Sequence, residues 1–215
     1  MIAPEAEGSD RTRLQVSGLR CIRDDRDLFA DLSFDLDAGQ LLLVEGRNGC
    51  GKTTLLRILC GIRSQESGSV LWRGEAIDEL GALYHQQIAY VGHHDGVKRE
   101  LTVVENIRLA QALGNPSDFG IDEILETIQL SGYEEVPTRV LSAGQKRRLA
   151  LSRLLATNSE LWILDEPFTS LDSRAIGIFE NLMATHTADG GSVIMTSHHR
   201  VELEGVAVRH LRLSA

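Results

Sequence analysis

The sequence contains few cysteines, and this shortage excludes a disulfide-stabilised scaffold. Its 215 residues include only 3, Cys21, Cys50 and Cys60, which form neither a CxxC pair nor a closely spaced disulfide framework. An odd and scattered set of thiols is typical of a reducing compartment. The sequence also lacks internal repeats and low-complexity segments, and its 42% hydrophobic and 25% charged residues are ordinary for a soluble globular protein.

Long hydrophobic runs and an excess of positive charge are missing as well. No apolar run approaches the ~20 residues that a membrane-spanning helix needs, and the runs at 41–44 and 161–164 have the length of buried strands. The 22 basic and 31 acidic residues give a formal net charge of −9, which disfavours electrostatic binding to nucleic acid or to an acidic bilayer. Residues 1–12 lack the basic and apolar segments of a secretory signal, so we expect a polar tail there.

A glycine-rich motif follows the first apolar run. Residues 46–53 read GRNGCGKT and match GxxxxGK[ST] in full, between an expected strand at 41–44 and an expected helix at 54–60. This order suits a phosphate site, because loop N–H groups and the helix N-terminus hold the phosphates, Lys52 reaches the β and γ oxygens and Thr53 ligates Mg²⁺. The alternative is a glycine-rich turn with an incidental lysine. The predicted nucleotide-binding residues are Gly46, Arg47, Asn48, Gly49, Cys50, Gly51, Lys52, Thr53 and Thr54.

The second apolar run ends in two carboxylates, Asp165 and Glu166. A run that is apolar at every position suits a parallel strand buried on both faces, and groups just past its C-terminal end lie where α/β sheets bind ligands. Asp165 is the candidate that holds Mg²⁺, directly or through water, and Glu166 is the candidate general base. Such an ending could also be structural, but the upstream phosphate motif favours the catalytic interpretation.

A third motif, LSAGQ at 141–145, precedes this strand. The continuation KRRLALSRLLA has a helical pattern, with Ala150, Leu151, Leu154 and Leu155 on one side. A serine and a glycine at a helix N-terminus can bind an anion through N–H groups and a hydroxyl. For this segment viewed alone, a simple serine N-cap is the alternative.

In this order, the three motifs resemble those of the ATP-binding-cassette (ABC) ATPases. LSAGQ is similar to the LSGGQ signature of that family, with Ala143 in place of the first glycine. An expected strand at 192–196 leads to His198 at the position of the switch histidine, and the resemblance spans roughly 14–213. The residues that resemble the signature and the D-loop are, respectively, Leu141, Ser142, Ala143, Gly144 and Gln145, and Ser170, Leu171 and Asp172.

The resemblance implies an α/β fold, a P-loop NTPase core of ABC type with an antiparallel β subdomain and an inserted helical subdomain. We expect a single ABC ATPase domain at 13–215, with the helical subdomain at about 95–152 and antiparallel strands in LQVSGL, LSFDLD and SVLWRG. The implied ligands are ATP and Mg²⁺. In the ATP-bound state two copies would pair head to tail, the signature of one meeting the γ-phosphate held by the other. The implied catalytic residues are Lys52, His93, Glu166 and His198.

The segment GHHDGVK, at 92–98, departs from the family pattern. It follows an expected strand at 88–91, and His93 stands where the family has the Q-loop glutamine that touches Mg²⁺ and the attacking water. A neutral imidazole can still accept from water or reach the metal, and histidine changes charge near neutral pH. Metal or haem ligation by His93 and His94 is the competing interpretation. It is disfavoured because adjacent residues of an extended chain point to opposite faces.

A second departure lies near the N-terminus. The family's adenine-stacking aromatic would fall near Arg23 in CIRDDRDLF. A guanidinium plane can stack on a base as an aromatic ring does, so Arg23 is the candidate adenine platform. A solvated loop arginine is the alternative, and the preference for ATP over GTP stays open.

These features together resemble a narrower group, the ATP-binding subunits of haem exporters in cytochrome c maturation. That resemblance implies a peripheral subunit on the cytoplasmic face of the bacterial inner membrane, with membrane subunits of the CcmB and CcmC type as partners and release of the haem-loaded chaperone CcmE. We expect neither a nucleic-acid partner nor direct membrane insertion. In 97–107, Arg99, Glu100 and Glu105 could contact the membrane subunits or form a solvated helix face.

Two other functions stay open at this point. One is the ATPase subunit of another small exporter. The more distant one is a soluble ABC-type ATPase that acts on ribosomes or DNA, which the single cassette, the acidic balance and the lack of a heptad run disfavour.

Overall fold

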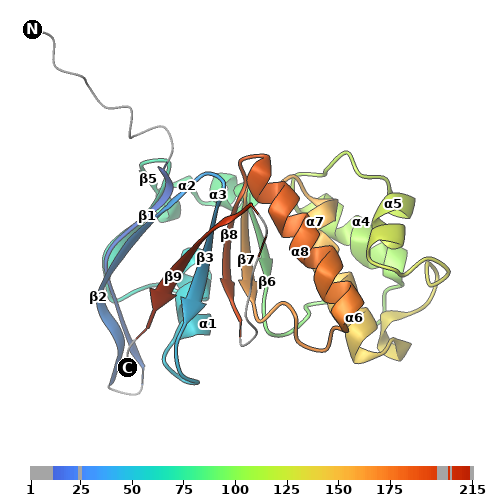
Figure 1. Cartoon of the computed structure of the whole chain (residues 1–215), viewed down its shortest axis with the longest axis horizontal. Coiled ribbons are helices and arrows are strands. Elements are labelled where there is room, and N and C mark those ends of the chain that lie inside the picture. The colour runs from blue at the N-terminus through green and yellow to red at the C-terminus, as the bar shows by residue number, and fades with distance from the viewer. Residues whose placement is uncertain (1–11, 24–25, 198–202, 204, 214–215) are drawn as a thin grey trace, which may run out of the picture.

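The computed structural model describes residues 12–23, 26–197, 203 and 205–213. It places an antiparallel sheet, a parallel sheet and a group of helices side by side (Figure 1). The first strand already begins at Thr12, so the expected polar tail is one residue too long at its C-terminal end; residues 1–11 lie outside the described residues.

The parallel sheet carries the strands on which the site was predicted. Its order is β6-β7-β8-β3-β9, and every neighbouring pair is parallel. All residues of β7 and β8 are buried, as expected for strands covered on both faces. The expected strands at 41–44, 88–91, 161–164 and 192–196 are thereby confirmed. The strands are β3 (Gln40–Glu45), β6 (Ile88–Val91), β7 (Leu161–Asp165), β8 (Ser192–Thr196) and β9 (Ala207–Arg212).

The second sheet is antiparallel, as expected, with the order β2-β1-β4-β5. Its strands alternate buried and exposed residues over much of their length, because one face packs on the core and the other meets solvent. The strands are β1 (Thr12–Arg23), β2 (Arg26–Asp37), β4 (Ser67–Trp72) and β5 (Glu75–Ala76).

Most helices lie on the side of the parallel sheet away from the antiparallel sheet, and α8 runs across the sheet's face (Figure 1). The chain from 103 to 156 forms a group of helices between β6 and β7 in the sequence. The helical insertion was expected at about 95–152. The helices are α1 (Lys52–Leu59), α2 (Ile77–Leu80), α3 (Ala82–Gln87), α4 (Val103–Leu113), α5 (Ile121–Thr127), the 3₁₀ turn η1 (Thr138–Val140), α6 (Ala143–Leu151), α7 (Arg153–Ala156) and α8 (Ser173–Ala188).

The helix expected after the signature is broken at Ser152. Its hydroxyl donates to the carbonyl of Leu149 at 2.7 Å, so the side chain competes for an acceptor of the helical backbone. The chain then restarts as the short helix α7. The apolar face predicted from the sequence is nevertheless buried on both pieces.

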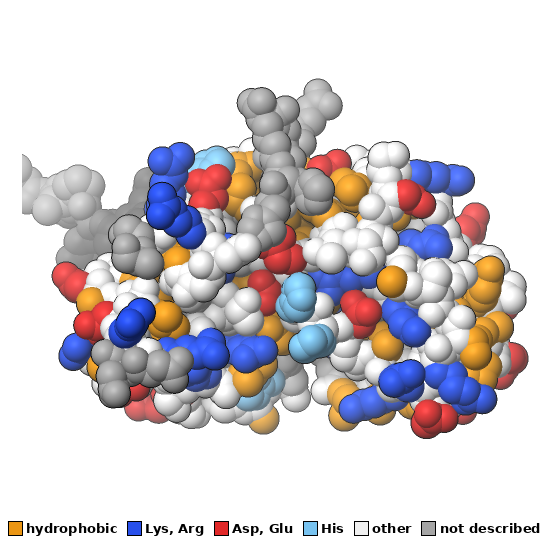
Figure 2. All heavy atoms as spheres, turned by 90° about the horizontal axis from the view of Figure 1, so that it is seen from below, with side chains coloured by type: hydrophobic (Ala, Val, Ile, Leu, Met, Phe, Trp, Pro, Cys, Tyr) orange, Lys and Arg blue, Asp and Glu red, His pale blue; other side chains and the backbone are white. Residues whose placement is uncertain are grey.

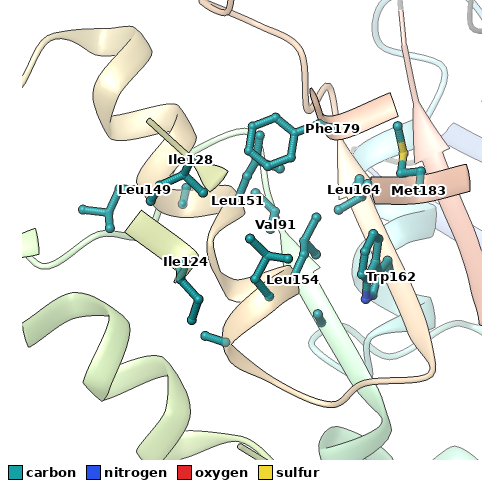
Figure 3. Packing of buried hydrophobic residues seen from close by; sticks show 14 of the residues in the cluster. Val91, Ile124, Ile128, Leu149, Leu151, Leu154, Trp162, Leu164, Phe179 and Met183 are labelled. Atoms are coloured by element: carbon teal, nitrogen blue, oxygen red, sulfur yellow. The ribbon is translucent and has the colours of Figure 1, made fainter. Parts of the chain in front are cut away.

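A continuous apolar core joins the helices to the parallel sheet. Figure 3 shows Leu149 and Leu154 of α6 and α7 with Trp162 of β7 and Phe179 of α8 in this cluster. A second cluster fills the space between the two sheets and contains the inner face of α1, including Leu55. The two clusters fix the sheet between its neighbours, so that the carboxyl ends of its strands form one firmly supported edge.

Candidate nucleotide site

The phosphate loop lies between β3 and α1, as predicted. Helix α1 begins at Lys52, two residues earlier than expected. Gly46 has a φ of 153°, and a Cβ there would come within 2.5 Å of the Cys50 sulfur and 2.8 Å of the Leu213 carbonyl oxygen. The ammonium of Lys52 donates to the carbonyl of Gly46 at 2.8 Å and to that of Arg47 at 3.4 Å. The lysine therefore closes the loop on itself, in the position from which it would reach phosphate oxygens.

Thr53 and Asp165 meet at the base of this loop. The Thr53 hydroxyl donates to one Asp165 carboxylate oxygen at 2.8 Å, and the Thr196 hydroxyl donates to the other at 2.8 Å. Asp165 is only 2% exposed, so these bonds replace the water that its charge would otherwise hold. The sequence placed Thr53 and Asp165 together, whereas it gave no indication of Thr196.

This oxygen pair fits Mg²⁺. Hydroxyl and carboxylate oxygens are ligands that Mg²⁺ prefers, and the Thr53 oxygen keeps a lone pair for a metal while its proton is donated to Asp165. Within the described part of the chain, no cluster of three or more His, Cys, Asp or Glu residues is suited to hold a metal ion. The remaining ligands would therefore come from phosphate and water, which is how Mg²⁺ is usually bound beside nucleotides.

Glu166 follows in an uncommon backbone conformation, with a φ of 51°. Its N–H donates to the Thr196 hydroxyl at 2.9 Å, and its carbonyl accepts from the Arg147 guanidinium at 2.7 Å. A non-glycine residue in the left-handed region costs on the order of 1–3 kcal/mol and persists where its surroundings hold it. The candidate base is thus fixed by its backbone at the mouth of the site.

A cleft of about 790 Å³ brings most of the predicted residues together. It lies where the strands of the parallel sheet end, on the face that Figure 2 shows, with histidine side chains near the middle of that face. Arg26 and Leu28 of β2 also line it; sequence reasoning missed both, although they stand three and five residues after Arg23. The predicted residues that line the cleft are Arg23, Asn48, Gly49, Gly51, Lys52, Thr53, Thr54, His93, Asp165 and Glu166.

Cys50 belongs to the loop but not to the cleft. Its side chain is 2% exposed and packs in the cluster between the two sheets. Gly46 and Arg47 do not line the cleft either, although their carbonyls hold Lys52. These three residues therefore support the conformation of the loop without lining the cleft.

The signature segment lies outside this cleft. Ser142 is the N-cap of α6 and forms a capping box with Gln145, so the alternative of a structural serine cap is met. Ala143 is exposed, whereas a Cβ on Gly144 would come within 2.9 Å of the Ser170 carbonyl oxygen. The second glycine of the signature is therefore required by packing within the chain, and the first is not.

The D-loop residues connect the signature to helix α8. Ser170 has a φ of 66° and presents its carbonyl to Gly144, while the Asp172 carboxylate caps α8 by accepting from Ala175 N–H at 2.8 Å. Leu171 packs against the core of the helical group. None of the three lines the cleft.

His93 and His94 follow β6 in an irregular segment. The two rings lie 5.6 Å apart and nearly perpendicular, so the premise that the side chains diverge on an extended chain is wrong. Both are exposed, and only His93 lines the cleft. His198, the predicted switch histidine, lies outside the described residues.

Arg147 is a further residue that sequence reasoning did not single out. It lies in the basic run after the signature but is 3% exposed. The signal was available in the helical period, because Arg147 stands four residues before Leu151 and seven before Leu154, on the face that is otherwise apolar. Burial lowers the pKa of its guanidinium, and the carboxylate of Asp95 opposes that shift.

A second cavity, of about 450 Å³, lies toward the amino ends of the strands. Trp162 and His186 stack there with ring centroids 3.8 Å apart and an interplanar angle of 5°. Burial lowers the pKa of His186 to about 4, so its ring is neutral at neutral pH. Arg13 and Arg73 both pair with Glu160 at the rim.

Comparisons with known proteins add the family. Residues 29–169 match the sequence model of the family described as ABC transporter. The chain is 48% identical over 203 residues to the cytochrome c biogenesis ATP-binding export protein CcmA of Nitrosococcus oceani, with 94% of this chain and 93% of that protein covered. It is 49% identical over 203 residues to the protein of the same name from Methylococcus capsulatus, covering 94% and 98%.

Solved structures share the fold. One, described as the ATP binding subunit of an ABC transporter, superimposes with a TM-score of 0.85 at 25% identity, over 95% of this chain and 89% of that one. Another, a putative ABC transporter ATP-binding protein from Pyrococcus furiosus, has a TM-score of 0.78 at 22% identity and covers 94% and 97%. The architecture, the match to the family and the extent of identity lead to one conclusion: this chain belongs to the CcmA family of ABC transporter ATP-binding proteins.

Proposed function

We propose that the chain is the ATP-hydrolysing subunit of a membrane complex for cytochrome c biogenesis, in which ATP turnover serves haem export or release of the haem-loaded chaperone CcmE. The observation that carries the ATPase part is the cleft that gathers Lys52, Thr53, Asp165 and Glu166. The biogenesis part is supported by relatives that share nearly half of their residues with this chain and carry that role in their names.

Nucleotide binding begins at the phosphate loop. The loop N–H groups and the N-terminus of α1 would hold the phosphates, and Lys52 would exchange its bonds with Gly46 and Arg47 for bonds to phosphate oxygens. Thr53 and Asp165 would hold Mg²⁺, which supplies positive charge against the phosphates. Arg23 would stack on the base in the same cleft, which Leu28 also lines.

Hydrolysis requires a water activated next to the γ-phosphate. The Glu166 carboxylate lines the cleft and would accept a proton from that water as it attacks in line. His93, which lines the cleft on the neighbouring segment after β6, would orient the water or complete the metal surroundings by accepting a hydrogen bond. The predicted role of His198 beside the γ-phosphate stays a proposal.

A second copy of the chain would complete the site. Ser142 accepts a hydrogen bond from Gln145 N–H at 3.2 Å, so its own hydroxyl proton remains available for an anion. The hydroxyl is exposed at the N-terminus of α6 and lies away from the cleft of its own chain. A head-to-tail pair in the ATP-bound state would bring it to the γ-phosphate held by the partner subunit.

Membrane subunits of the CcmB and CcmC type would dock beside the edge strand β6. A groove of about 330 Å³ lies between β6 and α4, lined by Tyr90, Leu109 and the 78% exposed Leu113 among others. Glu105 closes the capping box of α4, and Glu100 pairs with Arg139 at 3.2 Å, so these carboxylates already have structural roles. Of the described helices, none is both long and apolar enough to cross a bilayer. We place the subunit on the cytoplasmic face of the bacterial inner membrane, held by these partners.

The test uses cells whose only copy of the protein carries Glu166→Gln. We expect the purified variant to bind ATP but to lose at least about 100-fold in kcat, and the cells to lose covalent haem from c-type cytochromes on a haem-stained gel while other haem proteins stay intact. Glu126→Gln, an equivalent change at an exposed position of α5, is the matched control and should stain normally. Normal staining of cells with the inactive Glu166→Gln enzyme would reject the biogenesis role and leave the chain as the ATPase of another exporter.

A further inference from the structure

The Arg147 guanidinium of α6 holds the backbone that carries the candidate base. Its Nε donates to the Pro167 carbonyl at 2.9 Å, and its Nη2 donates to the carbonyls of Asp165 at 3.0 Å and Glu166 at 2.7 Å. Three consecutive carbonyls, from the last residue of β7 onward, therefore point at one guanidinium. They lie on both sides of the left-handed turn at Glu166, which is the conformation most in need of support.

The same guanidinium holds the segment that carries His93. Its Nη1 donates to the Gly92 carbonyl at 2.8 Å and to the Asp95 carboxylate at 3.3 Å. His93 lies between these two attachment points in the sequence. One side chain thus holds two segments that line the cleft, the one with Glu166 and the one with His93.

The geometry suits arginine specifically. A guanidinium has five N–H donors in a fixed plane, and Arg147 makes five hydrogen bonds. Asp95 is the carboxylate partner in these bonds, and the nearby carboxylates of Asp165 and Glu166 also favour the charged guanidinium. A lysine ammonium has three donors and cannot reproduce the planar fork.

We propose that Arg147 is a positioning residue for ATP hydrolysis, which ties the Glu166 loop and the His93 segment to the helix that begins at the signature serine. Because Ser142 caps the start of α6, a movement of the signature onto a partner's nucleotide would be passed through Arg147 to both of these segments. This inference rests on the proposed ATPase function and adds a residue through which the signature and the base act together.

The test compares Arg147→Gln and Arg147→Lys with Arg148→Gln. Arg148 is the next residue of the same helix, and its guanidinium holds the carbonyls of Ile128 and Gln129 within the helical group, away from the cleft. We expect both Arg147 variants to lose about 30-fold or more in kcat, since misplacement by 1 Å costs about 100-fold, with the Kd for a fluorescent ATP analogue changed less than about threefold. Arg148→Gln should lower the melting temperature about as much as the Arg147 variants do. Its kcat should stay within about threefold of the wild-type value.

Asp95→Asn keeps the inference testable if the Arg147 variants fold poorly, and a double-variant cycle extends the test if they fold. Asp95→Asn removes the negative charge of one partner and leaves the four carbonyl bonds, so we expect a smaller loss, about threefold in kcat, and no additional loss when it is combined with Arg147→Gln. Additive losses, or equal loss of kcat in the Arg147 and Arg148 variants, would overturn the inference. These readings come from the purified enzyme, so they can fail while the haem stain supports the proposed function, and the reverse can also occur.

Discussion

Both ends of strand β7 bury polar atoms, but they treat charge in opposite ways. At the carboxyl end, Asp165 keeps both oxygens hydrogen-bonded to hydroxyls from other elements, those of Thr53 and Thr196. At the amino end, Trp162 stacks on His186, and neither the Trp162 Nε1 nor the His186 Nε2 has a hydrogen-bond partner among the described residues. The first end pairs its buried polar atoms, whereas the second leaves its buried polar atoms unpaired and keeps its ion pairs at the rim.

This difference shows which end of the sheet can do chemistry. A paired polar group keeps its reactivity once water is removed, while an unpaired titratable group is driven to its neutral form. Burial lowers the pKa of His186 to about 4 for that reason. Changes at the carboxyl end should therefore affect catalysis, and changes at the amino end should affect stability and its dependence on pH.

Thr196→Val should give the largest effect of the three changes that test this contrast. The two side chains have the same shape, but valine leaves an Asp165 oxygen and the Glu166 N–H without their partner in the core. We expect a loss of about 2–4 kcal/mol in the free energy of unfolding and, because Glu166 loses an anchor, about tenfold or more in kcat. Urea unfolding and steady-state ATPase assays measure the two effects.

Thr187→Val is the matched control. Thr187 is also buried, but its hydroxyl bonds only to carbonyls of its own helix α8, at Met183 and Ala184. We expect less than about 1 kcal/mol of destabilisation and an unchanged kcat. Equal kinetics for the two variants would mean that pairing at the carboxyl end does not serve catalysis.

His186→Phe tests the amino end. The folded-state pKa of about 4 lies below the ordinary value of 6.5. The contribution of the neutral ring to the stability of the fold is therefore fully present above pH 6.5 and is lost as the pH falls toward 4. Phenylalanine keeps the stack on Trp162 and cannot be protonated. Between pH 8 and pH 5 we expect the wild-type protein to lose on the order of 2 kcal/mol of its free energy of unfolding through His186, a loss that the variant avoids. At pH 8 the two proteins should have free energies of unfolding within about 1 kcal/mol of each other.

Unfolding curves at several pH values measure the stability of His186→Phe, and ATPase assays measure its activity. Parallel pH profiles for the variant and the wild-type protein would show that another group causes the acid destabilisation. A large change in the kcat of His186→Phe at pH 8 would contradict the expectation that the amino end of β7 affects stability and not catalysis.

His93→Gln should give the smallest effect. The segment that carries His93 is positioned by the Gly92 carbonyl and the Asp95 carboxylate, neither of which changes. Glutamine can accept a hydrogen bond from water as imidazole does, so we expect kcat within about threefold of the wild-type value, and about a tenfold loss for His93→Ala. A glutamine variant as impaired as the alanine variant would show that the imidazole itself is required.

The sequence was informative wherever a pattern of residue types is itself the cause of the structure. The apolar runs of β3 and β7 predict buried parallel strands, and the polar segments after them meet in one cleft because parallel strands end at a common edge. The glycines before Lys52 predict the turn around the phosphates, because glycine itself permits the backbone conformations that the turn needs.

The missed features depend on partners that a sequence pattern does not encode. Four of the five bonds of Arg147 go to backbone carbonyls, which every residue has, so their arrangement follows only from the folded chain. The pairing of Thr196 with Asp165, 31 residues apart, depends on the register between β7 and β8. The divergence expected of His93 and His94 assumed an extended chain, and the turn after β6 removes that assumption.

The left-handed backbone at Glu166 sets a trade-off between stability and activity at this position. Glycine would adopt a φ of 51° without penalty, so a chain selected for stability alone would favour glycine there. In the proposed mechanism a carboxylate at this position serves turnover, against the conformational preference of the backbone. Stabilising substitutions screened by melting temperature alone would therefore tend to accumulate at the residue that the proposed mechanism can least replace.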